Sequence, residues 1–308
     1  MRRSGAEVTQ DWSGTFGART TADEVVADLD LSGQLVIVTG ANSGIGFHTA
    51  RALASAGARL IFACRDSAAG ADAVERTLTA HPGAIAEVGV LDLGLRRSIR
   101  DFAAHIDADS IDTIICNAGV FGGPYQEVDG GLERTVGVSH VGHFLLVTAL
   151  LPKLLARGGG RVVMVASRSH RQTRTLDFDR LPLTATQYSG IVAYGQAKLC
   201  NVLFANELQR RYGAEGLTAC SLHPGSAMAT NIARSSRVAS LFMKLISPLT
   251  KDLSVGAATS IVCATHPHRG EISGRYFSDC RPKIPSALAR DVVAAECLWK
   301  KTEEWLEA

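Results

Sequence analysis

The sequence lacks the cysteine patterns that mark a disulfide-stapled domain or a zinc site. Its seven cysteines include no CxxC pair and follow no regular spacing. An odd count at this low density argues against a disulfide framework, and most of the cysteines lie in apolar runs, as small core residues do. We therefore expect a reducing, cytoplasmic environment.

Strong charge and long apolar runs are also missing. The net charge is only +2, which argues against a nucleic-acid-binding protein. Two arginines near the N-terminus are not followed by an apolar stretch, so we expect neither a signal peptide nor a membrane anchor. We also expect no membrane span, because no window approaches the run of about 18 apolar residues that a bilayer requires. With 46% hydrophobic and 20% charged residues, the composition is typical of a soluble globular protein.

From residue 34 onward, short apolar runs alternate with stretches of three-to-four periodicity. The runs lack two-residue alternation, which predicts strands covered on both faces: 34–40, 58–65, 85–93, 112–119, 161–167 and 217–225. The periodic stretches predict helices at 44–57, 68–78, 96–106, 142–156 and 193–212. This alternation predicts one α/β domain over residues 31–308, with a doubly wound parallel sheet of about seven strands and helices on both faces. Residues 1–30 form a polar N-terminal extension.

A glycine-rich loop follows the first predicted strand and opens the first predicted helix. Its glycines, in the pattern TGxxxGxG, permit a tight turn and a close approach of the backbone to a pyrophosphate, and the helix N-terminus offers free N–H groups to the negative charge. The sequence therefore predicts a Rossmann-type dinucleotide site, to which we assign Gly40, Asn42, Ser43, Gly44, Ile45 and Gly46.

The end of the second predicted strand indicates which dinucleotide binds. Arg65 follows Cys64 there and is placed to contact the 2′-phosphate of NADP, with help from Ser43. The alternative is that Arg65 faces solvent and Asp66 binds the ribose hydroxyls of NAD. We expect NADP(H) in preference to NAD(H), and no metal.

Tyr194 and Lys198 lie four positions apart in the predicted helix 193–212 and so share one face. A solvated helix surface is the alternative explanation. The segments TGANSGIG, CNAG, a strand-terminal serine and YxxxK occur in this order and together resemble the short-chain dehydrogenase/reductase family over almost all of residues 30–280. The segments SHVGHFLL, SRSHRQT and HPGSAMATNI are similar to its retinol dehydrogenase branch.

The resemblance implies three catalytic side chains. Tyr194 is the general acid in carbonyl reduction and the base in alcohol oxidation, although a free phenol has a pKa near 10. Lys198 is expected to lower that pKa by its charge and to bind the nicotinamide ribose. Ser167 is expected to donate a hydrogen bond to the substrate oxygen. Ser169 is a weaker candidate for this role, and Tyr188 has no lysine four positions later.

The resemblance also assigns further cofactor contacts. Asn117 holds the fourth strand and lines the cofactor pocket, and Asp92 contacts the adenine unless it is an ordinary helix N-cap. The remaining expected contacts are Leu93, Ala118, Gly119, Pro224 and Gly225.

Ser139 departs from the family pattern. It stands where relatives carry an asparagine that holds a water between the lysine and bulk solvent. A serine offers one hydroxyl where asparagine offers a carbonyl and an amide. Three interpretations remain open: Ser139 holds the same water, it weakens the proton relay, or catalysis is degraded and the protein serves as a dinucleotide sensor or scaffold.

Two segments are expected to form the substrate side. The stretch between Ser167 and Tyr194 offers leucines and a phenylalanine, and residues 230–251 form an amphipathic helix that resembles a lid. Packing against the domain or contact with a membrane surface are the alternatives for that helix. His140, His143 and His170 lack metal-ligand spacing, and His143 is expected to pack inside a helix.

An apolar lid suggests a lipophilic ketone, aldehyde or alcohol as substrate. An epimerase or dehydratase that uses the same site is the other enzymatic alternative. The resemblance implies a homodimer formed through the Tyr194 helix and the helix before it, unless the long segment before Tyr194 blocks that surface.

Overall fold

The six expected strands all form, and they lie in one sheet with two more. In the computed structural model, which describes residues 15–225 and 253–307, the sheet strands are β1 Leu35–Thr39, β2 Arg59–Cys64, β3 Ile85–Val90, β4 Thr113–Cys116, β7 Arg161–Val165, β8 Thr218–His223, β9 Tyr276–Ser278 and β10 Arg281–Lys283. Their order is β10-β9-β8-β7-β4-β1-β2-β3. All neighbours pair in parallel except β10, which is antiparallel to β9. The predicted doubly wound sheet is confirmed, with eight strands rather than about seven.

The five helices expected between residues 44 and 212 also form, with boundaries within a few residues of those predicted. The α-helices are α1 Ala22–Val26, α2 Gly44–Ser55, α3 Ser67–Ala80, α4 Arg96–Ala104, α5 Arg134–Val136, α6 Gly142–Leu155, α7 Gly190–Tyr212, α9 Leu253–Thr265, α10 Arg269–Ile272 and α11 Val292–Glu307. A π-helical turn, η1 Gly137–Val141, joins α5 to α6. Short 3-10 turns are η2 Ala156–Gly158, η3 Arg168–Gln172, η4 Phe178–Arg180, η5 Gly213–Glu215 and η8 Leu288–Arg290. A separate hairpin pairs β5 Glu127–Val128 with β6 Leu132–Glu133.

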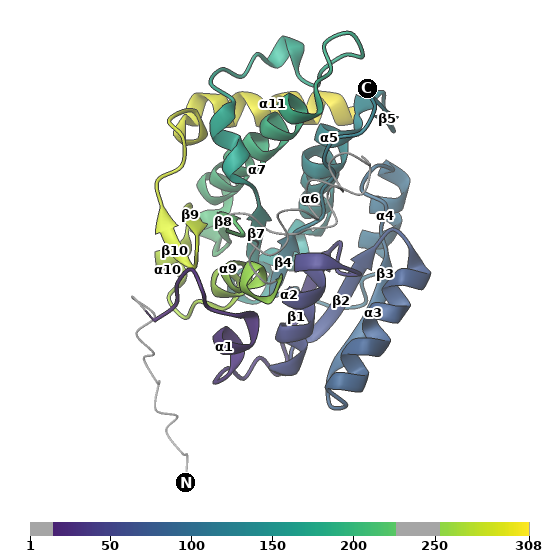
Figure 1. The fold of residues 1–308 in the computed structure, drawn as a ribbon, viewed down its shortest axis with the longest axis vertical. Coiled ribbons are helices and arrows are strands. Elements are labelled where there is room, and N and C mark those ends of the chain that lie inside the picture. The colour runs from purple at the N-terminus through teal and green to yellow at the C-terminus, as the bar shows by residue number, and fades with distance from the viewer. Residues whose placement is uncertain (1–14, 226–252, 308) are drawn as a thin grey trace, which may run out of the picture.

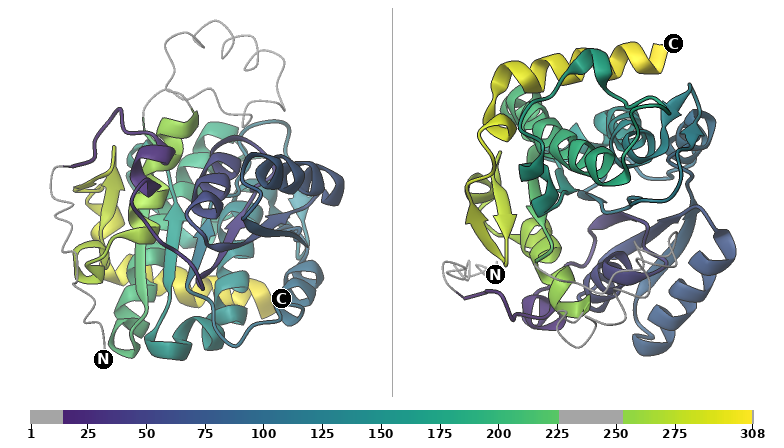
Figure 2. Two further views of the ribbon diagram at one scale, coloured as in Figure 1. Left: turned by 90° about the horizontal axis from the view of Figure 1, so that it is seen from below. Right: turned by 45° about the horizontal axis from the view of Figure 1, so that its top comes forward.

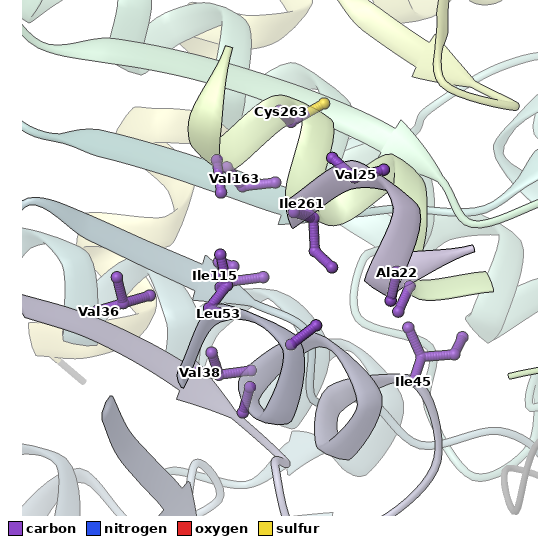
Figure 3. Close-up of a cluster of buried hydrophobic side chains, with 14 of the residues drawn as sticks. Ala22, Val25, Val36, Val38, Ile45, Leu53, Ile115, Val163, Ile261 and Cys263 are labelled. Atoms are coloured by element: carbon purple, nitrogen blue, oxygen red, sulfur yellow. The ribbon is translucent and has the colours of Figure 1, made fainter. Parts of the chain in front are cut away.

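Helices cover both faces of the sheet (Figure 1). Alternate residues of a strand point to opposite faces, so Val36 and Val38 of β1 pack with α1, α2 and α9, whereas Leu35 and Ile37 pack with α4, α6 and α7. Figure 3 shows the first of these clusters, in which Ile261 of α9 lies over Ile115 and Val163 of the central strands. The helical layers thus fix the strand ends that carry the site.

Part of the expected N-terminal extension contributes to this first cluster. Ala22, Val25 and Val26 of α1 are buried against α2 and α9. The backbone N–H of Ala22 donates to the Ser254 hydroxyl at 3.2 Å, and Arg51 of α2 pairs with Asp23 at 2.7 Å. Residues 20–31 therefore pack on the sheet-covering helices.

One expectation about the strands is wrong. Strand β3 was expected to be covered on both faces, but its residues alternate between exposed and half-buried, and Ile85 and Val90 are largely exposed. The physical reason is its position at the edge of the sheet, where α3 packs against it and a hollow of about 700 Å³ opens between it and α4.

A second difference from the sequence-based expectation is that one helical stretch is apolar enough to cross a membrane. The stretch Arg134–Gly158 is long enough to cross a membrane and contains an 18-residue window with a mean hydropathy of 1.5, although 56% of that window is buried inside the structure. Its apolar side chains Phe144, Leu146, Val147 and Leu150 pack against the sheet. This apolarity therefore builds the core under the site.

The C-terminal helix α11 lies across α7 on the outer side of the molecule (Figures 1 and 2). Its Trp299 is buried against Phe144 of α6, with ring centroids 4.7 Å apart, and against Phe204 of α7 at 5.8 Å. The chain's own α11 thus covers part of the surface of α7 and the start of α6 through which pairing was expected. Leu176 and Phe178, in the segment before Tyr194, pack against a neighbouring cluster that includes Leu298 of α11.

Candidate active site

The carboxyl ends of four central parallel strands open onto one cavity of about 380 Å³. Such strand ends are where doubly wound sheets bind ligands. The cavity brings together the sequence-predicted residues Gly40, Asn42, Ser43, Gly44, Ile45, Gly46, Asn117, Ala118, Gly119, Ser167, Tyr194, Lys198, Pro224 and Gly225. The predicted glycine loop, CNAG segment, serine and YxxxK pair therefore form one continuous wall.

The glycine loop has the shape that a pyrophosphate needs. Gly44 has a φ of +60°, and an added Cβ would meet nothing within 4 Å, whereas a Cβ on Gly46 would lie 2.4 Å from the Gly40 carbonyl oxygen. Ser43, the N-cap of α2, makes no side-chain capping hydrogen bond. The first turn of α2 therefore presents its N–H groups to the cavity, and the loop fits a dinucleotide phosphate.

Asn117 and Thr39 join the ends of β1 and β4. The Asn117 amide donates to the Thr39 carbonyl oxygen at 2.8 Å, and the backbone N–H groups of Asn117 and Ala118 both donate to the Thr39 hydroxyl oxygen at 2.9 Å. The expected structural role of Asn117 thus has specific partners. These bonds hold the CNAG segment against the glycine loop.

Tyr194 and Lys198 face the cavity from consecutive turns of α7. The Lys198 Nζ lies 5.5 Å from the Tyr194 ring centroid and donates to the Val165 carbonyl oxygen of β7 at 2.9 Å. Ser167 follows β7, and its hydroxyl hydrogen-bonds the Tyr194 phenol. The competing Ser169 instead donates its backbone N–H to Ser167 Oγ at 3.2 Å. The Tyr194 phenol, the Lys198 amine and the Ser167 hydroxyl therefore lie close together in the cavity.

Burial controls the ionisation of this pair. It raises the pKa of the Tyr194 phenol, and the hydrogen bond from Ser167 offsets part of that rise. Burial also lowers the pKa of the Lys198 amine to about 8. The sequence predicted a lowered phenol pKa from the charge of Lys198. In the structure the pKa is raised, because both groups are buried and removal from water dominates.

Ser139 lies in the π-helical turn η1, fully buried beneath the CNAG segment. Its hydroxyl oxygen accepts a hydrogen bond from the Val120 N–H at 3.4 Å. A Cβ built on Gly119 would lie 3.3 Å from Lys198 Nζ and 3.4 Å from Ser139 Oγ. The missing side chain of Gly119 therefore leaves a position that borders both the lysine and the serine.

The predicted cofactor residues Arg65, Asp92 and Leu93 do not line the cavity, and neither does Asp66, the alternative ribose ligand. Arg65 follows β2 and is exposed, and Asp66 is the N-cap of α3, with its Oδ1 accepting from the Ala68 and Ala69 N–H groups at 3.0 Å. Asp92 follows β3, where its Oδ1 accepts from the Gly94 N–H at 2.8 Å.

The alternative role of Asp92 as a helix N-cap is wrong, because the N-cap of α4 is Leu95. Leu93 is buried, and its carbonyl oxygen lies close to Gly142 of α6, where a Cβ would be 2.2 Å away. The loop that carries Leu93 thus packs closely against α6.

Sequence reasoning missed Val165, Ala166 and His223 among the cavity-lining residues. The first two precede Ser167 and the third precedes Pro224, so proximity to the predicted strand ends was the available signal. The second half of the predicted substrate side, residues 230–251, lies outside the described residues.

The described substrate side is aromatic. Phe121 packs edge-on against Tyr194 with ring centroids 4.8 Å apart, and Tyr125 packs against Tyr188 at 5.6 Å. A Cβ on Gly190 would lie 3.0 Å from the Gly122 Cα, so the loop after β4 touches the start of α7. The apolar ring of Phe121 therefore stands beside the phenol. In the described part of the chain, no group of three or more His, Cys, Asp or Glu residues is arranged to hold a metal ion.

Comparison with known proteins places this site in a family. Residues 34–177 match the short chain dehydrogenase family. The chain is 41% identical to human WW domain-containing oxidoreductase over 300 residues, which cover 95% of this chain and 72% of that protein. It is 39% identical to human retinol dehydrogenase 12, with coverage of 91% and 88%.

A solved structure also resembles this chain. The crystal structure of an uncharacterised protein from Mycobacterium paratuberculosis superposes with a TM-score of 0.75 at 32% identity, covering 92% of this chain and 97% of that one. The resemblance of the motifs to this family, whose members use nicotinamide dinucleotides, is thereby confirmed. The chain belongs to the short-chain dehydrogenase/reductase family of oxidoreductases.

Proposed function

We propose that this chain is an NADP(H)-dependent carbonyl reductase or alcohol dehydrogenase acting on a lipophilic ketone, aldehyde or alcohol. The observation that carries the proposal is the meeting of Tyr194, Lys198 and Ser167 at the cavity that also holds the glycine loop. An isolated YxxxK pair on a helix surface would have neither the serine nor the phosphate loop beside it.

The bound nicotinamide supplies or accepts the hydride, and the chain handles the proton. In the reductive direction Tyr194 gives its phenolic proton to the carbonyl oxygen, and Ser167 donates a hydrogen bond to the same oxygen. Burial raises the pKa of the phenol and so keeps its proton in place near neutral pH. Lys198, whose pKa burial lowers to about 8, still carries charge in this range and opposes the negative charge that develops on the phenol oxygen.

The preference for NADP(H) over NAD(H) rests on the end of β2. The Asp66 carboxylate already accepts two backbone N–H groups of α3, which competes with binding of the ribose hydroxyls of NAD. Arg65 is exposed beside it and presents a planar fork of donors suited to a 2′-phosphate. Asp92 follows the next strand and is proposed to contact the adenine.

A lipophilic substrate is favoured by the ring beside Tyr194. Phe121 offers apolar contact where a substrate carbonyl must approach the phenol. The name of a related protein, retinol dehydrogenase 12, points to the same class of compound. We also propose a cytoplasmic location, since all seven cysteines are free thiols and six of them are buried.

Ser139 is proposed to serve in the proton relay in place of the family's asparagine. The position left open at Gly119 borders both Lys198 Nζ and Ser139 Oγ, so a water there would contact both groups. A hydroxyl both donates and accepts a hydrogen bond, as a relay requires. A water at this position would join the Lys198 amine, which lies beside Tyr194, to the Ser139 hydroxyl in η1.

The experiment that tests the proposal is turnover of NADPH with a panel of hydrophobic ketones and aldehydes. The parent chain is expected to oxidise NADPH, and Tyr194→Phe to lose roughly 100-fold or more of kcat while still binding NADPH. Tyr188→Phe is the matched control, because Tyr188 precedes the same helix and should leave kcat within about threefold.

The other outcomes identify the alternatives. NADPH binding without turnover in the parent would indicate a sensor or scaffold. Conversion of substrate without net consumption of NADPH would indicate an epimerase or dehydratase. Unchanged turnover in Tyr194→Phe would contradict the role of the phenol.

A further inference from the structure

His143 makes two hydrogen bonds to parts of the site that lie far apart in the sequence. It is fully buried in the first turn of α6, one turn after Ser139. Its Nδ1 lies 3.0 Å from the Ser139 carbonyl oxygen, and its Nε2 lies 2.9 Å from the Thr39 hydroxyl oxygen. The imidazole therefore spans the gap between the π-helical turn η1 and the end of β1.

The partners determine which ring nitrogen carries the proton. A carbonyl oxygen only accepts, so Nδ1 must donate to Ser139. Burial lowers the pKa of His143 to about 4, and the charge of Lys198 acts in the same direction, which leaves the ring neutral. Nε2 is then an acceptor, and the Thr39 hydroxyl must donate to it.

This arrangement uses every hydrogen-bonding position of the Thr39 hydroxyl. Its oxygen accepts from the N–H groups of Asn117 and Ala118, which leaves its single proton to donate. The nearest alternative acceptor, the Ile115 carbonyl oxygen, is 3.5 Å away, against 2.9 Å for His143 Nε2. The chain of bonds thus runs from the CNAG segment through Thr39 and His143 to Ser139.

We propose that His143 is a positioning residue that sets the spacing between the CNAG segment and the Ser139–Lys198 relay. This inference rests on the proposed function, because it assigns His143 to the same proton path. A Cβ built on Gly119, at the end of the CNAG segment, would lie 3.3 Å from Lys198 Nζ and 3.4 Å from Ser139 Oγ, and the Val120 N–H donates to that oxygen. A shift of η1 relative to the segment would change both distances.

A purely structural histidine would be expected to have different partners. His140 provides that comparison, since it is also fully buried and lies three residues earlier in η1. Its Nε2 bonds Thr302 of α11 at 3.0 Å, and its ring packs on Phe204. His140 thus holds the C-terminal helix, whereas both partners of His143 belong to the site.

The test compares three substitutions at position 143 with His140→Leu. The amide nitrogen of His143→Asn reaches the place of Nδ1 and keeps the bond to Ser139, whereas His143→Gln reaches toward Thr39 and His143→Leu keeps neither bond. We expect His143→Leu to lose roughly 10- to 100-fold in kcat with the affinity for NADPH changed less than about threefold. His143→Asn should recover most of that loss, and His140→Leu should keep the parent kcat while lowering the unfolding midpoint.

A second readout does not depend on turnover. Nitrogen NMR of the full-length parent, with the His143 signal assigned through His143→Asn, should report a neutral Nδ1–H tautomer at neutral pH. An Nε2–H tautomer or an imidazolium would overturn the inference, as would equal losses of kcat in His143→Leu and His140→Leu. If the parent reduces no carbonyl but the tautomer is as stated, the proposed function fails while the bonding arrangement of His143 stands.

Discussion

At position 139 the chain carries a serine whose hydroxyl accepts from Val120 and borders the space beside Gly119. We predict that Ser139→Asn changes turnover by less than about tenfold, or ~1.4 kcal/mol in the barrier, because either side chain can hold a water at that space. Steady-state kinetics with NADPH and the best carbonyl of the panel provide the measurement. A gain far above tenfold would mean that the serine impairs the relay in the natural protein.

Arg65 should decide the choice of dinucleotide. We predict that Arg65→Gln weakens NADPH binding by roughly 10- to 100-fold and leaves NADH binding nearly unchanged, because the variant loses a charge-assisted contact with the 2′-phosphate. Calorimetric titration with both dinucleotides measures this. Arg59→Gln is the control, since Arg59 lies at the opposite end of β2 and pairs with Glu87 at 2.8 Å. Equal weakening of both dinucleotides by Arg65→Gln would contradict the assignment.

The site residues that sequence analysis could identify are those in short motifs beside strand ends. Tyr194, Lys198 and Ser167 were identifiable because glycine loops, strand termini and YxxxK spacing are local patterns. The role of His143 was not identifiable, since its partner Thr39 is 104 positions away. The direction of the pKa shift of Tyr194 was also missed, because it depends on burial that only the folded chain defines.

Two histidines give the segment formed by η1 and α6 a pH-dependent stability. Burial lowers the pKa of His140 to about 3 and of His143 to about 4, from 6.5. Each ring is neutral in the folded chain and gains a proton on unfolding, so the free energy of unfolding is highest above about 6.5 and falls as the pH decreases toward 4. Between about pH 7.5 and 5.5 we predict a combined loss of roughly 3 kcal/mol.

Urea unfolding at the two pH values measures this loss, and His140→Phe separates the contributions. The His140 Nδ1 has no hydrogen-bond partner among the described residues, and the Thr302 hydroxyl also donates to the Leu298 carbonyl oxygen. The phenylalanine variant should therefore fold and show about half of the pH-dependent loss. A loss as large as that of the parent would argue that other groups cause it.

Secondary structure was predictable where an element is long and apolar. Strands β1, β2, β4, β7 and β8 are buried on both faces. Their apolar composition alone therefore indicates that they are strands. Strands β9 and β10 have three residues each, and the residues of β10 are all exposed. Their pairing with β8 and with each other defines these strands, and no local pattern indicates it.

On the scale of the whole molecule, α11 closes the outer side of α6 and α7. Trp299 is buried between them, its indole N–H donates to Glu303 at 2.7 Å, and the Arg211 guanidinium lies 4.3 Å from its ring centroid. Part of the surface through which a homodimer was expected is therefore occupied by the same chain. We predict that sedimentation reports one chain per particle.

The substitution Trp299→Ala tests how strongly α11 is held against α6 and α7. Loss of the indole should lower the free energy of unfolding by about 3–5 kcal/mol, because it leaves a cavity against Phe144 and Phe204. If α11 loosens, the exposed apolar face should also increase self-association. A parent that sediments as a dimer, or a variant with parental stability, would contradict this account of α11.

Transfer of an isotopic label tests the central claim most directly. NADPH that carries deuterium at the transferring position is incubated with the full chain and a hydrophobic ketone, and the product is examined by mass spectrometry. The account predicts an alcohol with one deuterium on the former carbonyl carbon, formed by the parent and by Tyr188→Phe, with Tyr194→Phe strongly impaired. Binding of NADPH with no labelled alcohol, or equal labelling by Tyr194→Phe, would contradict it.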